Sequence, residues 1–335
     1  MVAAWRERVH VAQGFPTPDT DAAPDSVFLV LFFVSALSHM FIFLRNKKRG
    51  RFFIFNALCI GFSMARVVTC SLRLAWMYNI DNRGLAIAAT IFVAAGVLIL
   101  FIIHLLFAQR IVRGLHPHLG WHKFFSRALL VLYVLVPLLL VMVITATVQL
   151  FYTTDRKLIQ DDIDMQRGAS TYFLFFAFLP ILITAFALVY PKKTEPDHFG
   201  KGKFWHKAAV VIMASVLLTL GAGFRTGTAF LTWKQEYSTP GNAPWWNAKW
   251  CFYFFNFTVE IITVLMYLVV RIDLLFHVPD GSKGPGSYSR TADSSSKEED
   301  VETRVLQRPS VDRVPRGSKP GGNPVEAYTA EKERA

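Results

Sequence analysis

Three ionisable residues, Arg66, Arg225 and Glu260, lie within long apolar stretches of the sequence. In a membrane each would cost about 3 kcal/mol or more, so each is expected to face the interior of a helix bundle and to find a partner there. One carboxylate facing two guanidinium groups leaves one positive charge, and a guanidinium group binds a carboxylate or phosphate through two hydrogen bonds. We therefore expect an anion-binding site. The alternative is a structural salt bridge, with one arginine extending its stem towards the bilayer surface.

Small and polar residues surround these charges. Gly223 and Gly227 flank Arg225 with the small-xxx-small spacing that lets two helices approach closely, so we expect them to pack this helix against a neighbour. Asn256 precedes Glu260 by four residues, which is about one helical turn. We expect Asn256 to form a hydrogen bond between helices and to belong to the same ligand site.

The elements that must position these residues are seven apolar stretches of about 20 residues, the length needed to cross a hydrocarbon core of about 30 Å. They are residues 26–44, 52–72, 85–108, 128–148, 169–190, 208–231 and 250–270. A rise of about 1.5 Å per residue places Arg66 and Glu260 at nearly the same depth, with Arg225 about one turn nearer the outer surface. The sequence predicts an all-α integral membrane bundle of seven transmembrane helices.

The charge distribution predicts the orientation of this bundle. The chain is 53% hydrophobic, yet it carries a formal charge of +12. The loops after the first, third and fifth spans hold fourteen Lys and Arg residues, whereas the opposite loops and the N-terminal tail hold nine. Basic loops are retained in the cytoplasm, so we expect the N-terminus outside and the C-terminus in the cytoplasm. The positive charge then reports topology, and we expect no nucleic-acid partner.

Three segments follow from this pattern. Residues 1–25 form an extracytoplasmic tail, residues 26–276 form the seven-helix domain, and residues 277–335 form a cytoplasmic tail. The last segment is rich in Gly, Ser, Pro and charged residues, which bury too little apolar surface to offset the entropy of ordering, so we expect it to be disordered.

Catalytic and metal-binding patterns do not emerge from the sequence. His116, His118 and His122 gather in one loop, but Pro117 interrupts their spacing and no Cys or carboxylate lies close to them in sequence. The chain contains neither HExxH nor GxSxG. We therefore expect no enzymatic activity, no metal site and no cofactor.

Short motifs in the last two spans carry a family resemblance. Residues 26–281 resemble an uncharacterised family of fungal seven-transmembrane proteins, some of which carry a G-protein-coupled-receptor-like label. The chain is more distantly similar to the fungal lipid-translocating exporter-like family, which is associated with resistance to aminocholesterol. That similarity rests on Arg225 in the sixth span, on Tyr253 to Asn256 with Asn in place of Asp, and on His277-Val278-Pro279-Asp280-Gly281 after the seventh span.

Topology and the basic inner loops favour a receptor-like sensor of an anionic or amphipathic ligand, whereas the charges within the spans fit either function. The alternative is a transporter or translocator of lipids or small molecules. The expected partners are membrane lipids, the ligand itself, and a cytoplasmic signalling partner at the basic inner loops and tail. Either function places the protein in the plasma membrane or an endomembrane.

Overall fold

The computed structural model describes residue 5 and residues 14–191, 195–231, 244–279 and 281–289. Within these residues, seven helical spans are long and apolar enough to cross a membrane. They are α1 (Pro18–Lys48), α2 (Ile54–Tyr78), α3 with α4 (Arg83–Gly96 and Leu98–Leu115), α6 (Lys123–Tyr152), α7 (Arg156–Val189), α8 (Phe204–Phe230), and α9, η3 and α10 in succession (Lys249–Tyr253, Phe254–Thr258 and Val259–Val270). The expected class, an all-helical multi-pass membrane protein, is confirmed for the described residues.

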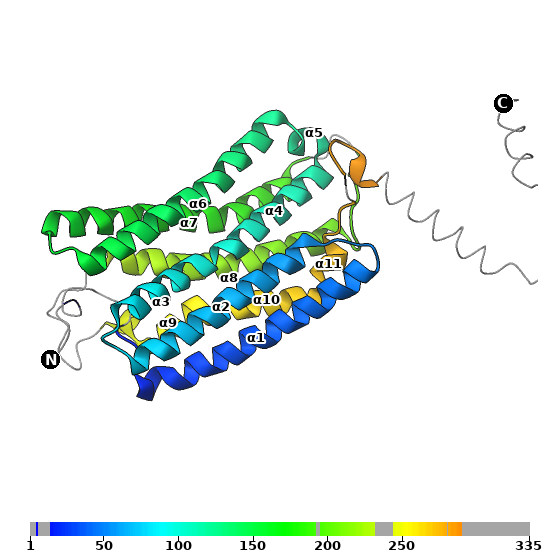
Figure 1. Cartoon of the computed structure of the whole chain (residues 1–335). Helices are drawn as coiled ribbons and strands as arrows, with labels where there is room; N and C mark the ends of the chain where they lie inside the picture. The colour runs from blue at the N-terminus through cyan, green and yellow to red at the C-terminus, as the bar shows by residue number, and fades with distance from the viewer. Residues whose placement is uncertain (1–4, 6–13, 192–194, 232–243, 280, 290–335) are drawn as a thin grey trace, which may run out of the picture. The chain divides into compact units, whose positions relative to one another are not determined.

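The spans run side by side along a common direction, as Figure 1 shows. Helix α1 packs on α2, and α7 packs on both α6 and α8. The central element is α4, which contacts α2, α7 and α8 and buries most of its side chains. Helix α10 contacts α8 and α1, so the last span closes the bundle against the first. This closure brings residues of α2, α8 and α10 within reach of one another.

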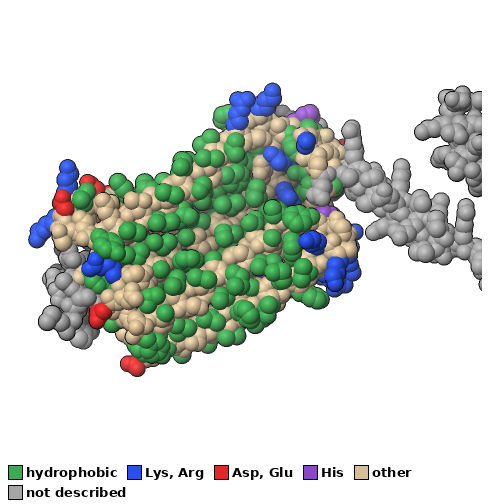
Figure 2. All heavy atoms as spheres, in the orientation of Figure 1, with side chains coloured by type: hydrophobic (Ala, Val, Ile, Leu, Met, Phe, Trp, Pro, Cys, Tyr) green, Lys and Arg blue, Asp and Glu red, His purple; other side chains and the backbone are tan. Residues whose placement is uncertain are grey.

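The outer wall of the bundle is apolar. On α6 the exposed side chains include Leu130, Val134, Leu138 and Val141, which recur every three or four residues along one face. Figure 2 shows hydrophobic side chains covering the wall, with Lys, Arg, Asp and Glu confined to its two ends. In water such a wall would be strongly unfavourable, and in a bilayer it is the surface that lipid tails contact.

The first span begins earlier than expected. We placed residues 18–25 in an extracytoplasmic tail, but α1 begins at Pro18 and carries both Asp21 and Asp25 as fully buried residues. Asp21 and Asp25 lower the local hydropathy, so hydropathy alone places them in a loop outside the first span. Their charges are instead compensated by cationic side chains from other spans, which allows them to lie inside the bundle.

Two spans are interrupted. The regular hydrogen bonding of the third span is interrupted at Val97, between α3 and α4, although the backbone of Val97 keeps helical dihedral angles. The seventh contains a π-helical turn, η3, whose wider winding leaves the carbonyl group of Tyr253 to accept a hydrogen bond from the hydroxyl group of Thr258 at 3.3 Å. Both interruptions lie beside the charges that the sequence singles out.

The end of the bundle where α4 and α10 finish is closed by short helices and by the residues after the last span. Helix α5 (Pro117–Gly120) follows α4, and α11 (Ile272–Leu275) follows α10. Asp273 at this end accepts hydrogen bonds from Asn46 and Arg271, each at 2.9 Å. Burial raises the pKa of the Asp273 carboxyl group, but these hydrogen bonds outweigh it and hold that pKa below its ordinary value.

The expected disordered tail begins too early at residue 277. The described residues after it pack on the bundle, and Tyr288 is only 3% exposed. The glycine and serine content of this segment predicts disorder, but the Tyr288 ring packs against Trp121 and Phe199 and holds the segment on the bundle. The remainder of the expected tail, residues 290–335, lies outside the described residues.

Candidate functional site

Arg66 and Glu260 form the core of the site. The Nε atom of Arg66 donates to Oε2 of Glu260 at 2.5 Å, and Nη2 donates to Oε1 at 2.7 Å. Both side chains are fully buried. Two parallel hydrogen bonds between a guanidinium group and a carboxylate are the strongest geometry for such a pair, and they fix the orientation of both planes. The depth estimate from the sequence thus brought together the correct residues of α2 and α10.

The break in the third span completes the coordination of Arg66. Its Nη1 atom donates to the carbonyl oxygens of Phe92 and Val93, at 3.1 and 3.0 Å. These carbonyls lie in the last turn of α3, where an interrupted helix leaves acceptors without their usual partners. A side chain at Gly96 would meet the guanidinium group, since its Cβ would lie 3.1 Å from Cζ of Arg66. Span three is therefore shaped around this arginine.

Arg225 from α8 approaches the same carboxylate from a third helix. Its Nη2 atom lies 3.7 Å from Oε1 of Glu260, beyond hydrogen-bond distance. That atom is buried without a hydrogen-bond partner, and Arg225 donates no side-chain hydrogen bond to any described residue. Its side chain remains 22% exposed. Because Glu260 is already engaged by Arg66, the guanidinium group of Arg225 retains its capacity to bind an anion.

The close approach between α8 and the seventh span occurs at a different glycine from the two we expected. A Cβ at residue 221 would lie 2.6 Å from the carbonyl oxygen of Phe255, so only glycine fits there. Gly223 has an ordinary contact with Leu174, and Gly227 has open space around it. The assignment of Gly223 and Gly227 to close packing is wrong, because the π turn moves the backbone of the seventh span towards Gly221.

Asn256 does not form the expected hydrogen bond between helices. Its amide nitrogen donates to the carbonyl oxygen of Phe252 in its own span, at 2.9 Å. Its side-chain oxygen is buried and has no hydrogen-bond partner among the described residues. The π turn rotates this residue relative to a regular helix, which sequence spacing does not reveal.

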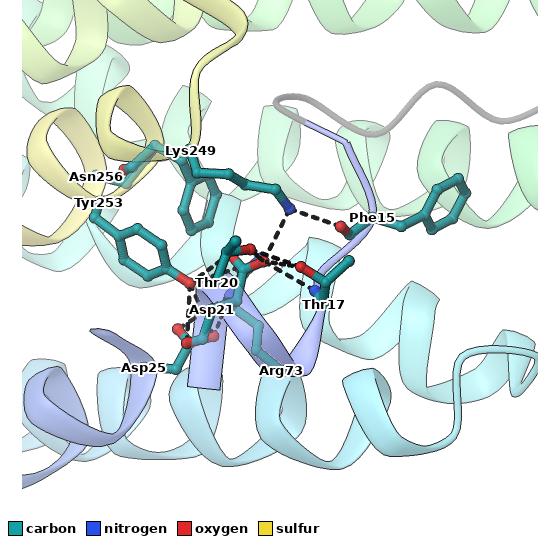
Figure 3. Close-up of polar contacts among 10 residues, drawn as sticks. Phe15, Thr17, Thr20, Asp21, Asp25, Arg73, Lys249, Tyr253 and Asn256 are labelled. Carbon is teal, nitrogen blue, oxygen red and sulfur yellow. Dashed lines mark hydrogen bonds and ion pairs between the residues drawn. The ribbon is translucent and has the colours of Figure 1, made fainter. Parts of the chain in front are cut away.

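A second polar cluster lies towards the N-terminal end of α1, and the sequence analysis missed it (Figure 3). Arg73 donates from Nε to both carboxylate oxygens of Asp25, at 3.1 Å each, and its Nη2 atom lies 3.4 Å from Asp21. Lys249 contacts Asp21 at 2.9 Å, and the hydroxyl group of Tyr253 donates to Asp21 at 2.7 Å. Two acids and two bases balance, so this cluster ties α1, α2 and α9 together without surplus charge.

One signal could have revealed this second cluster. Arg73 follows Arg66 by seven residues, and Glu260 follows Tyr253 by seven. Residues seven apart lie on nearly the same face of a helix, two turns away from each other. One face of α2 therefore supplies an arginine to each cluster, about two turns apart.

Comparison with known proteins shows that part of the chain is similar to a family whose activity is not known. Residues 117–205 and 201–277 match a family described as "Protein of unknown function (DUF3112)". The matched residues include Arg225 and Glu260 but not Arg66. Neither a curated protein nor a solved structure matches the chain. The similarity supports the resemblance to an uncharacterised family. The similarity to lipid-translocating exporters stays a prediction, and Asp280 of its last motif lies outside the described residues.

Proposed function

We propose that the protein is a receptor-like membrane sensor that binds an anionic amphiphile through Arg225. The observation that carries this proposal is the guanidinium group of Arg225, which lies 3.7 Å from a carboxylate already paired with Arg66 and makes no hydrogen bond of its own among the described residues. Arg66, Arg225 and Glu260 together carry one surplus positive charge. A ligand that supplies one negative charge would neutralise it.

The surroundings favour a carboxylate or a phosphate on an apolar molecule. Guanidinium groups bind both anions through paired hydrogen bonds, and these bonds are stronger where water is excluded. Phe224, beside Arg225, stacks on Phe255 with ring centroids 4.2 Å apart. Leu220 on α8 and Phe254 on the seventh span are exposed apolar side chains of the two spans that meet here. An acyl chain would lie against such surfaces while its headgroup reached Arg225.

The experiment compares binding of an acidic lipid by the protein in detergent. A fluorescent fatty acid is titrated against the wild type, Arg225→Gln and Arg225→Lys, with a zwitterionic lipid of the same chain length as the ligand control. Arg225→Gln is expected to weaken binding about tenfold or more, because charge-assisted hydrogen bonds are lost. Arg156→Gln is the matched control, since it removes an exposed arginine at the start of α7. Equal affinity in Arg225→Gln and the wild type would refute the proposal.

A second candidate function, translocation, is favoured by the interrupted spans. Broken transmembrane helices beside charged groups are common in transporters, where they form the substrate site. The break at Val97 and the π turn at Phe254–Thr258 flank the same ion pair. Flux of the labelled fatty acid in sealed liposomes separates the candidates. Transfer that Arg225→Gln abolishes would support a translocator, whereas binding without transfer would support the sensor.

For the sensor we further propose a cytoplasmic signalling partner at the basic inner loops. We also propose that the protein binds and responds to ligands without catalysing a reaction on them.

A further inference from the structure

Helix α1 buries mainly polar side chains in the bundle. Five of its seven buried residues are polar, and the seven are Asp21, Asp25, Phe32, Ser35, Ala36, His39 and Asn46. A polar group inside a membrane bundle costs free energy unless it is paired. Each of these five side chains should therefore have a hydrogen-bond partner.

Four of the five have partners on other elements. The two aspartates belong to the cluster that Figure 3 shows. The hydroxyl group of Ser35 lies 3.2 Å from that of Ser63 on α2. The side-chain nitrogen of Asn46 donates to Asp273 at 2.9 Å. These contacts hold α1 against α2 and against the segment that follows the seventh span.

His39 is the polar residue of this set that makes no hydrogen bond to any described residue. Its side chain is 1% exposed, and both of its ring nitrogens are buried without a hydrogen-bond partner. The ring lies next to the side chain of Asn56 on α2 and the backbone of Val264 on α10, but neither contact has hydrogen-bond geometry. The amide nitrogen of Asn56 is also buried without a partner. Three unsatisfied polar atoms from two helices therefore gather beside a carbonyl group of a third.

A second buried histidine shows how this bundle satisfies an imidazole ring. His104 on α4 is also 1% exposed. Its Nδ1 atom donates to the carbonyl oxygen of Leu100 at 2.6 Å, and its Nε2 atom accepts from the hydroxyl group of Tyr267 at 2.6 Å. Burial alone therefore does not account for the unsatisfied nitrogens of His39. Buried polar atoms without a protein partner are the groups that ordered water serves.

We propose that His39, Asn56 and the backbone of Val264 bind a water molecule that joins α1, α2 and α10 inside the bundle. Buried waters typically make about three hydrogen bonds to polar groups that lack other partners. An imidazole nitrogen, an amide nitrogen and a carbonyl oxygen provide both donors and acceptors for it. Val264 follows Glu260 by four residues, so the water links the helices that carry Arg66 and Glu260 about one turn from their ion pair.

Polar side chains lead from the end of the bundle towards this site. Asn46 follows His39 by seven residues, so the two lie on nearly the same face of α1, about two turns apart. Asn46 contacts Asp273, whose other partner, Arg271, has a side chain that is 37% exposed. Water can therefore reach His39 from the end of the bundle where α1 finishes.

The test measures contact between water and the two buried histidines in the full-length protein. The protein is labelled with ¹³C and ¹⁵N and placed in lipid bilayers, and magic-angle-spinning NMR follows the transfer of magnetisation from water protons to each imidazole ring. The ring of His39 is expected to receive magnetisation several-fold faster than the ring of His104. Exposed His118 is the reference for full contact with solvent. Transfer to His39 as slow as transfer to His104 would overturn the proposal.

A substitution then assigns the water to this set of residues. Asn56→Leu removes one of the three partners and is expected to slow the transfer to His39 several-fold. Asn79→Leu is the matched control, because it exchanges an exposed asparagine directly after α2. Unchanged transfer in Asn56→Leu, or an equal loss in Asn79→Leu, would refute the role of Asn56. The comparison of His39 with His104 uses the wild type, so it decides the proposal even where Asn56→Leu does not fold.

The water site does not involve Arg225. Failure of this inference and failure of the proposed anion site are therefore distinguishable, because Arg225→Gln is expected to leave the transfer to His39 unchanged.

Discussion

At the scale of single residues, Glu260 is the shared partner of two arginines but binds them unequally. Arg66 takes both carboxylate oxygens, whereas Arg225 remains at 3.7 Å. Breaking a buried ion pair is costly mainly because it leaves the other charge uncompensated. Arg66 and Glu260 therefore stabilise the fold, whereas Arg225 is the residue that we propose for ligand binding.

A stability comparison checks this division. Glu260→Gln leaves two guanidinium groups without a counter-charge, and we expect the free energy of unfolding to fall by about 3 kcal/mol or more. Arg225→Gln removes only the longer contact and is expected to melt close to the wild type. The measurement is thermal unfolding of the purified proteins in detergent, followed by tryptophan fluorescence. A Glu260→Gln protein as stable as the wild type would contradict the geometry.

Single-residue prediction from the sequence succeeded where depth alone decided the outcome. Arg66, Arg225 and Glu260 are charged, so their position along apolar spans sufficed to bring them together. Asn256 failed because a π turn rotates it. Asp21 and Asp25 were missed because their partners, including Arg73, come from spans that a local pattern does not connect.

At the scale of elements, the interruptions of the third and seventh spans shape the site. Residues 85–108 are largely apolar and contain no proline, and Gly96 directly before Val97 is only a weak local signal for the interruption. The seven spans themselves were predictable, because length and hydropathy suffice for that. The interruptions depend on tertiary contacts: Arg66 binds the carbonyl oxygens of α3, and Gly221 accommodates the backbone of the π turn.

Glycine exchange tests the packing of the π turn. Gly221→Ala would place a Cβ 2.6 Å from the carbonyl oxygen of Phe255, so we expect it to lower stability by about 1–3 kcal/mol and to displace the seventh span. Gly227→Ala is the matched control on the same helix, since nothing lies within 4 Å of its Cβ. Melting temperatures of the two variants give the result directly. Equal temperatures would show that α8 and the seventh span do not meet at Gly221.

At the scale of the whole molecule, the apolar wall and the polar ends account for residence in a bilayer. The charge asymmetry of the loops predicts which end faces the cytoplasm, and this orientation remains a prediction. The described cysteines, Cys59, Cys70 and Cys251, are free and buried, so they contribute little background to thiol labelling. Introduced cysteines can therefore report the side of the membrane.

Thiol labelling of intact cells checks the orientation. Arg156→Cys, at the start of α7, is expected to react with a membrane-impermeant maleimide added outside. Arg49→Cys, after α1, is expected to react only after permeabilisation. Both positions are exposed, so reactivity depends on the side of the membrane rather than on burial. The reverse pattern would show that the bundle has the opposite orientation.

The central claim is that Arg225 binds an anionic group within the bundle, and native mass spectrometry of the protein with its co-purified lipids tests it most directly. Wild type and Arg156→Gln are expected to retain an acidic amphiphile. Arg225→Lys, which keeps the charge, is expected to retain part of it, and Arg225→Gln to lose it. The same acidic lipid bound equally to Arg225→Gln and the wild type, or no acidic lipid on the wild type, would contradict the account.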